Sequence, residues 1–189
     1  MATVRSNSDS LEIEIKLAVA GAAAARRLLR AKGFRILKPR VFESNDVLDT
    51  PEQRLRNSGS LLRIRSVKRE VILTYKGRPR NSKHKSREEL ELNASDAHML
   101  GAILARLGFE RVFRYEKYRT EFTRGRTGVV TLDETPIGTY LELEGQPAWI
   151  DRTARVLGFT EADYITLSYG QLYLDRCKRE GSKAGDMVF

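Results

Sequence analysis

The sequence of 189 residues is poor in the side chains that build disulfides and soft-metal sites. It has one cysteine, Cys177, and two histidines, His84 and His98. A single thiol excludes an intramolecular disulfide framework and a cysteine-based zinc site, and two imidazoles are too few for a histidine-rich metal centre. Any metal site would therefore be built from carboxylates, which favour hard cations such as Mg²⁺, Mn²⁺ or Ca²⁺.

Long apolar runs are also lacking. No stretch approaches the length of a membrane-spanning helix, and the first residues, MATVRSNSDS, lack the apolar core of a signal peptide. We therefore expect a cytoplasmic protein with no membrane partner. Because the sequence has no low-complexity linker and no fixed-period repeat, we expect a single domain over residues 1–189.

Positive charge is in excess. The chain has 34 Lys and Arg residues against 25 Asp and Glu residues, which leaves a net charge of +9. Such a balance points to polyanionic partners, among them nucleic acid, nucleotides and polyphosphate.

Short strand-like runs dominate the chain, with few helices between them. Linkers such as KREV and TRGRTG suit antiparallel hairpins, whereas KGRPRNSKHKS (76–86) is a longer and strongly basic loop. About eight antiparallel strands with few helices predict an α+β fold built on a closed β-barrel, since closure removes exposed edges. The expected strands are 11–19, 41–49, 60–68, 70–77, 86–92, 111–123, 128–134 and 139–145, and the expected helices are 20–34, 94–109, 147–159 and one more in the tail.

The first strand, LEIEIKL, separates charged from aliphatic side chains completely. Glu12, Glu14 and Lys16 alternate with Leu and Ile, so one face of the strand is charged and the other is apolar. Five further strands repeat this alternation, and several carry charges of mainly one sign, as in Arg63-x-Arg65 and Glu142-x-Glu144. A solvated outer face would mix these charges with Thr, Ser and Gln. The pattern favours a barrel with a charged interior and an apolar exterior covered by helices.

An interior that holds both carboxylates and basic side chains requires a ligand that carries both a cation and an anion. Clustered carboxylates raise one another's pKa unless a divalent cation holds them, and clustered cations need an anion rich in oxygens. A polyphosphate chelated to Mg²⁺ or Mn²⁺ meets both needs. The carboxylates are Glu12, Glu14, Glu142 and Glu144, and the cations are Lys16, Arg63, Arg65, Lys76, Arg87, Lys117 and Arg119.

The ordered set of motifs resembles the CYTH superfamily, also called the triphosphate tunnel metalloenzymes. E-x-E-x-K in LEIEIKL is followed by LLRIR, TYKG, SREELEL, YEKYRTEF, TLDE and YLELEG. The superfamily includes class IV adenylate cyclases, thiamine triphosphatases and inorganic triphosphatases. Many members carry an aromatic residue in the strand before the DTP turn, where this chain reads NDVLDTP.

The resemblance implies an eight-stranded tunnel and a role for each charged position. Glu12, Glu14, Glu142 and Glu144 would hold Mg²⁺ or Mn²⁺, with Asp133 close to the metal. The seven cations would bind the triphosphate. Lys16 would also take part in catalysis, and Glu89 would act as a buffering acid or orient the cations.

Three functions remain open from the sequence. The first is a metal-dependent triphosphatase that acts on tripolyphosphate or an organic triphosphate, and it is our preferred prediction. The second is a class IV adenylate cyclase, which converts ATP into 3′,5′-cyclic AMP and pyrophosphate. The third, a basic nucleic-acid-binding module, is disfavoured because it has little need for E-x-E pairs. The sequence leaves open whether the chain forms a homodimer.

Five positions outside the charged strands carry expectations of their own. We expect His84 to be exposed in the basic loop and Cys177 to be a structural thiol. Trp149 is expected in the core. Ser168 and Tyr169 are expected to fix the last helix against the tunnel.

Overall fold

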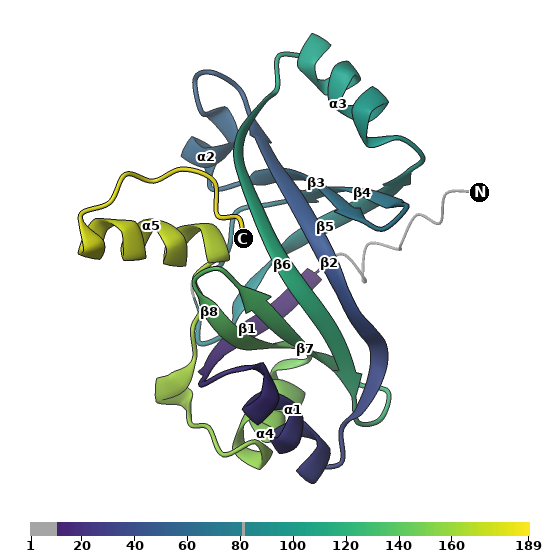
Figure 1. The fold of residues 1–189 in the computed structure, drawn as a ribbon, viewed down its shortest axis with the longest axis vertical. Coiled ribbons are helices and arrows are strands. Elements are labelled where there is room, and N and C mark those ends of the chain that lie inside the picture. Colours follow the sequence, from purple (N-terminus) through teal and green to yellow (C-terminus); the bar gives the residue numbers. More distant parts are fainter. Residues whose placement is uncertain (1–10, 81) are drawn as a thin grey trace.

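Eight antiparallel strands close into a barrel in the computed structural model, which describes residues 11–80 and 82–189. Around the barrel the strands follow the order β1-β5-β4-β3-β2-β6-β7-β8 (Figure 1). The predicted α+β fold with a closed eight-stranded barrel is therefore confirmed. The strands are β1 (Leu11–Val19), β2 (Arg35–Asp49), β3 (Leu61–Val67), β4 (Glu70–Lys76), β5 (Lys85–Ala94), β6 (Glu110–Thr123), β7 (Gly128–Thr135) and β8 (Gly138–Gly145).

Helices lie outside the barrel, mostly at its two ends (Figure 1). None of them, within the described ranges, has the length and apolar character needed to cross a membrane. Residues 1–10, which carry the expectation about a signal peptide, lie outside the described part of the chain. The helices are α1 (Ala22–Ala31), α2 (Arg54–Ser58), α3 (Ala97–Arg106), α4 (Pro147–Val156) and α5 (Tyr169–Glu180), with a 3₁₀ turn at Glu161–Asp163.

Two elements differ most from the prediction, while the bounds of the others differ by at most three residues at an end. Strand β2 begins at Arg35 instead of residue 41. Its register with β6 shifts between Ile36 and Lys38 and again between Lys38 and Val41, a stretch that contains Pro39, which has no N–H for the ladder. The short helix α2 was not predicted. Asp49 supports it by accepting hydrogen bonds from the backbone N–H groups of Leu55 and Arg56, both at 2.9 Å. The DTP turn thus has a structural use.

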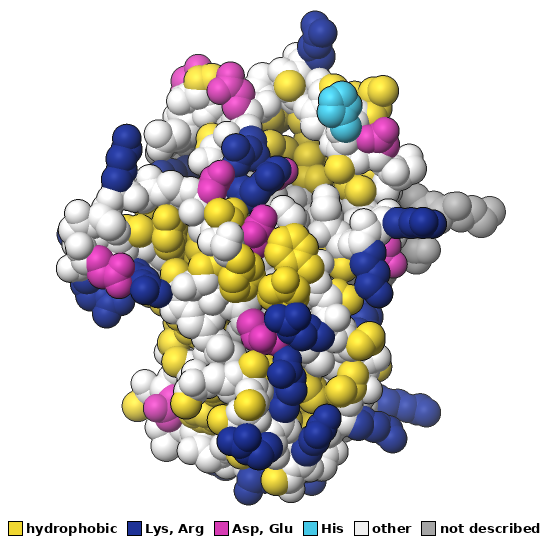
Figure 2. Space-filling view, in the orientation of Figure 1, with side chains coloured by type: hydrophobic (Ala, Val, Ile, Leu, Met, Phe, Trp, Pro, Cys, Tyr) yellow, Lys and Arg dark blue, Asp and Glu magenta, His cyan; other side chains and the backbone are white. Residues whose placement is uncertain are grey.

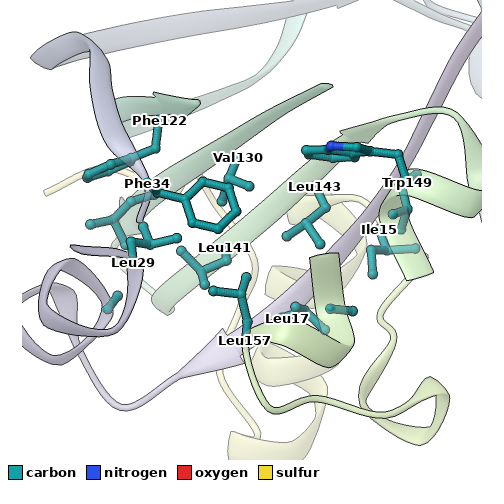
Figure 3. Close-up of a cluster of buried hydrophobic side chains, with 14 residues drawn as sticks. Ile15, Leu17, Leu29, Phe34, Phe122, Val130, Leu141, Leu143, Trp149 and Leu157 are labelled. Atoms are coloured by element: carbon teal, nitrogen blue, oxygen red, sulfur yellow. The ribbon is translucent and has the colours of Figure 1, made fainter. Parts of the chain in front are cut away.

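The main hydrophobic core lies outside the barrel wall, between β1, β7 and β8 on one side and α1 and α4 on the other (Figure 3). Ile15 and Leu17 of β1 are fully buried there, as are Leu141 and Leu143 of β8. Trp149 of α4 joins this cluster, so its predicted place in the core is confirmed. The apolar faces of these strands therefore point outward and leave the charged faces for the interior.

The helical cover is uneven. Helix α3 contributes Leu104 to a second cluster with Leu62 and Ile64 of β3. On β5, however, Leu90 and Leu92 each remain 51% exposed. The expectation that helices cover the whole apolar exterior is therefore wrong for β5. Excess positive charge also reaches the outside, because Lys and Arg side chains gather at the lower end of the face shown in Figure 2, where α1 lies in Figure 1.

Gly128 at the start of β7 allows Trp149 to pack closely. A Cβ atom placed on Gly128 would lie 2.6 Å from the Trp149 ring, whereas one on Gly101 in α3 would meet nothing within 4 Å. We expect Gly128→Ala to lower the free energy of unfolding by about 1–3 kcal/mol through overpacking. Gly101→Ala should leave it unchanged or raise it by up to about 1 kcal/mol. Urea denaturation of both variants measures the difference, and equal stabilities would contradict this account of the packing.

Candidate functional site: a charged tunnel

The barrel encloses a cavity of about 1660 Å³. Seven of the eight strands line it with charged side chains, and the eighth, β7, contributes Val129 and Thr131. Every residue that the sequence analysis placed in the site lines this cavity, apart from Asp133, which is fully buried behind it. The structure therefore brings the predicted residues together, while their individual roles stay predictions. The lining set is Glu12, Glu14, Lys16, Arg63, Arg65, Lys76, Arg87, Glu89, Lys117, Arg119, Glu142 and Glu144.

The strand register explains why these residues meet. Side chains on one strand face repeat every second residue, so opposed residues on paired strands face the same space. Lys16 of β1 lies opposite Glu142 of β8, and their charged atoms are 3.0 Å apart. In contrast, Glu14 lies opposite Glu144. Two like charges in register are unfavourable unless cations compensate them.

The carboxylates of β1 obtain this compensation from β4, β5 and β1 itself. Glu12 accepts hydrogen bonds from Lys76 at 2.7 Å and from Arg87 at 3.3 Å. Glu14 accepts from Lys85 at 2.6 Å and from Lys16 at 3.0 Å. Burial alone would raise the pKa of Glu14, but Lys16 and Lys85 lower it well below its usual value.

Asp133 is the most firmly held acid of the site. Its carboxylate accepts hydrogen bonds from Arg119 at 2.6 and 2.7 Å, from Lys117 at 3.1 Å and from the Tyr169 hydroxyl at 2.8 Å. Burial would raise the pKa of Asp133, but Arg119 and Lys117 lower it to about 2. Asp133 thus orients two cations of the tunnel wall.

Glu144 differs from the other carboxylates because it has no ion-pair partner within the described residues. Burial raises its pKa to about 7, and the charges of Glu12, Glu142 and Glu89 add to this rise. Its neighbour Glu142 is paired with Lys16 and Arg119, at 3.0 and 2.8 Å. Negative charge is therefore left uncompensated at the Glu144 end of the E-x-E pair.

This donor set fits a hard divalent cation in its chemistry, since Mg²⁺ and Mn²⁺ prefer carboxylate oxygens and would relieve the repulsion around Glu144. A ready-made metal geometry is not present in residues 11–80 and 82–189, where no three acidic, histidine or cysteine side chains are grouped as ligands. The reason is visible in the ion pairs: Lys76, Lys85 and Arg87 hold the oxygens of Glu12 and Glu14. A metal would have to replace these amines and the guanidinium.

Two tunnel residues, and two buried residues of β2 beside the tunnel, were missed by the sequence analysis. Lys85 pairs with Glu14, and Tyr115 accepts a hydrogen bond from Arg63 at 2.9 Å. Both lie two residues before a predicted site residue, so the period-two pattern could have found them. Glu43 and Asn45 of β2 are also buried in the barrel. Because β2 alternates Glu43, Asn45 and Val47, it shows no run of charge.

The loop before β5 departs from expectation at His84, which is buried and not exposed. Its Nε2 atom lies 2.8 Å from the Asp151 carboxylate of α4, which also accepts hydrogen bonds from Lys83 and Tyr164, both at 3.0 Å. This cluster fastens the basic loop to α4. Lys85 follows directly and enters the tunnel.

The remaining expectations about single residues agree with the structure. Cys177 is a buried free thiol. Ser168 caps α5 by accepting a hydrogen bond from the Gln171 N–H at 3.2 Å. Tyr169 follows in the first turn, and its ring lies 5.2 Å from the Lys16 amine. Helix α5 is therefore attached to the tunnel wall through Tyr169.

Known proteins share this fold and part of this sequence. A protein of Methanocaldococcus jannaschii named "Putative adenylate cyclase" is 27% identical over 147 residues, which are 78% of this chain and 83% of that protein. The PH1819 protein of Pyrococcus horikoshii superposes with a TM-score of 0.74 at 25% identity, over 87% of this chain and 99% of that one.

A plant protein has the same fold at lower identity. HpAC1 from Hippeastrum, described as a "putative adenylyl cyclase" with a dominant triphosphatase activity, superposes with a TM-score of 0.63 at 22% identity. The match covers 92% of this chain and 97% of that one. A family model also matches residues 10–157, which include every predicted site residue of the tunnel, and its family is the CYTH domain. The chain belongs to the CYTH domain family.

Proposed function

We propose that the protein is a triphosphatase that requires Mg²⁺ or Mn²⁺ and hydrolyses tripolyphosphate or an organic triphosphate. One observation carries the proposal: arginines and lysines line the same cavity as Glu144, a carboxylate that has no cation partner among the described residues. A chelated polyphosphate supplies the anion to the first group and the metal to the second. Membership of the CYTH family agrees with a substrate of this class.

The metal would be held by Glu12, Glu14, Glu142 and Glu144, which share the cavity and present carboxylate oxygens to it. When bound, a divalent cation neutralises phosphoryl oxygens and lowers the pKa of an oxygen that it holds. Asp133 would support the site from behind through its hydrogen bonds to Arg119 and Lys117.

The cations would bind the phosphates and stabilise the charge that spreads over their oxygens in the transition state. Arg63 and Arg65 present planar guanidinium groups on β3, which suit paired phosphate oxygens. Arg119 presents a third guanidinium group from β6, and Lys117 adds an ammonium charge beside it. The remaining members of the predicted set, Lys76 and Arg87, would turn from Glu12 toward the phosphates when the metal binds.

Lys16 and Glu89 would act within this wall. Burial would lower the pKa of Lys16, but Glu14 and Glu142 raise it above its usual value. We therefore assign Lys16 to charge stabilisation. Glu89 lies 3.0 Å from Lys76 and would orient that amine.

A class IV adenylate cyclase is the second candidate. It is favoured by the name of the Methanocaldococcus jannaschii relative, whereas the triphosphatase activity described for HpAC1 favours hydrolysis. Both reactions would use the same cations and metal, but cyclisation needs the ribose 3′-oxygen at the α-phosphorus, while hydrolysis needs only water.

Product analysis separates the two candidates. The purified protein is incubated with tripolyphosphate or ATP, each with Mg²⁺ or Mn²⁺, and the products are resolved. We expect orthophosphate to be released faster from tripolyphosphate than from ATP. If cyclic AMP and pyrophosphate are the main products, the protein is an adenylate cyclase and the triphosphatase assignment is wrong.

The carboxylates of β1 provide the test of metal dependence. We expect Glu12→Gln and Glu14→Gln each to lower kcat by at least about 100-fold at saturating Mg²⁺, since each removes a charged oxygen ligand. Both should remain folded by thermal melting. Glu88→Gln, an exposed acid on the outer side of β5, is the control and should keep normal activity. Near-normal turnover of either tunnel variant would contradict the metal assignment.

Ligand binding provides a second test that does not depend on turnover. Tripolyphosphate at 100 times its Kd should stabilise the protein by about 2.7 kcal/mol and raise Tm by roughly 5–10 °C. We expect the double variant Arg63→Ala, Arg65→Ala to lose most of this shift. Arg152→Ala, Arg155→Ala on the exposed side of α4 is the matched control and should retain it. An undiminished shift in the tunnel variant would place the anion elsewhere.

A further inference from the structure

Buried polar atoms without a hydrogen-bond partner gather on two adjacent strands of the barrel. Seven such side-chain atoms occur in the described part of the chain, and five of them belong to β2 and β3. They are Glu43 Oε2, Asn45 Oδ1, Asn45 Nδ2, Arg63 Nε and Arg65 Nε. Leaving such groups unpaired costs on the order of 1–3 kcal/mol each, so their concentration in one place calls for a partner.

All four residues face the inside of the barrel. Glu43 Oε2 lies 3.6 Å from the Lys117 amine, and Val47 lines the tunnel. Asn45 lies between them on the same strand, and the period of two places it on the same face. In the ladder, Asn45 is opposite Arg65 on one side and Tyr115 on the other. Asn45 has no exposed surface at all.

The five atoms divide into two chemical kinds. Arg63 Nε, Arg65 Nε and Asn45 Nδ2 are donors, and the oxygens of a phosphoryl group would satisfy them. Asn45 Oδ1 and Glu43 Oε2 are acceptors, and an ionised phosphate has no hydrogen to offer them. These two oxygens can accept hydrogen bonds from an O–H group that lies beside the phosphate.

Glu43 cannot become the donor itself. Burial would raise its pKa, but Lys117, Arg119 and Arg65 lower it to about 2, so the side chain is an ionised carboxylate. A phosphoryl oxygen next to it would be repelled, whereas a neutral hydroxyl would be attracted.

Space for a small molecule adjoins Glu43. The residue lines a second cavity of about 500 Å³ beside the β3–β4 turn. Arg65 and Arg119 line both this cavity and the tunnel, so they form the boundary between the two. A molecule that enters from the second cavity reaches Glu43 next to the arginines.

We propose that Glu43 and Asn45 bind the O–H group of the attacking molecule and aim its oxygen at the phosphoryl group held by Arg63 and Arg65. The inference rests on the proposed action on a triphosphate. The shared chemistry is a hydroxyl, which belongs to water in hydrolysis and to the ribose in cyclisation.

In the hydrolytic step, the water oxygen forms a bond to the terminal phosphorus as the bridging P–O bond breaks. The electron pair of that bond stays on the oxygen of the departing diphosphate, and the water proton leaves on a phosphate oxygen. Glu43 and Asn45 orient the water and do not retain the proton. Such orientation can contribute about 100-fold to the rate.

The experiment compares Glu43→Gln and Asn45→Ala with Ser44→Ala, which changes the opposite side of the same strand. Each protein is assayed with Mg²⁺ for orthophosphate from tripolyphosphate and for cyclic AMP from ATP, and its Tm is measured with and without tripolyphosphate. We expect the Glu43 and Asn45 variants each to lose about 100-fold in kcat, with KM within about threefold and the tripolyphosphate shift retained. Ser44→Ala should match the wild type.

The two arms identify the source of the hydroxyl. A loss confined to orthophosphate release assigns water, and a loss confined to cyclic AMP assigns the ribose; either supports the inference. Active wild-type protein with kcat unchanged in both variants would overturn this inference alone, as would a loss that appears only in KM and the Tm shift. Wild-type protein inactive in both arms would overturn the proposed function and this inference together.

Discussion

Pairing of buried opposite charges is the interaction on which this barrel depends. In the described residues, each carboxylate that lines the tunnel lies within 4 Å of a lysine or arginine, except Glu144 and Asp49; Asp49 accepts hydrogen bonds from backbone N–H groups instead. Buried charge without a partner is costly, so this interior is compatible with folding only because both signs alternate around the wall. The apolar material that usually fills a small barrel lies outside instead, under α1 and α4.

The charged interior and apolar exterior of the barrel explain how much of the structure could be predicted from the sequence. A strand such as LEIEIKL must place its charged face and its apolar face in different environments. The E-x-E, R-x-R and K-x-R runs indicate which strand faces lie together in the charged interior. Strand β2 gives no such signal, because Glu43, Asn45 and Val47 are chemically mixed. His84 and Lys85 were obscured by the basic loop around them. The contacts of His84 and Lys83 with Asp151, far away in sequence, show that this loop is held in place.

Helix α5 and the DTP turn illustrate a second limit of sequence patterns. In the sequence, Tyr169 resembles an ordinary aromatic residue of a terminal helix, yet its hydroxyl donates a hydrogen bond to Asp133 in the barrel wall. Asp49 resembles a site acid, yet it holds the first turn of α2. In both cases the residue type is compatible with either use, and the tertiary contact decides.

The ion pairs of Glu12 and Glu14 have a consequence for the forces that govern ligand entry. Lys76, Lys85 and Arg87 already have protein carboxylates as counterions, so an incoming metal and polyphosphate would exchange partners with them and would not neutralise free charge. Few dissolved ions are released in such an exchange. The affinity should therefore fall less steeply with salt concentration than it does for an open basic groove, where each contact displaces a counterion from the polyanion.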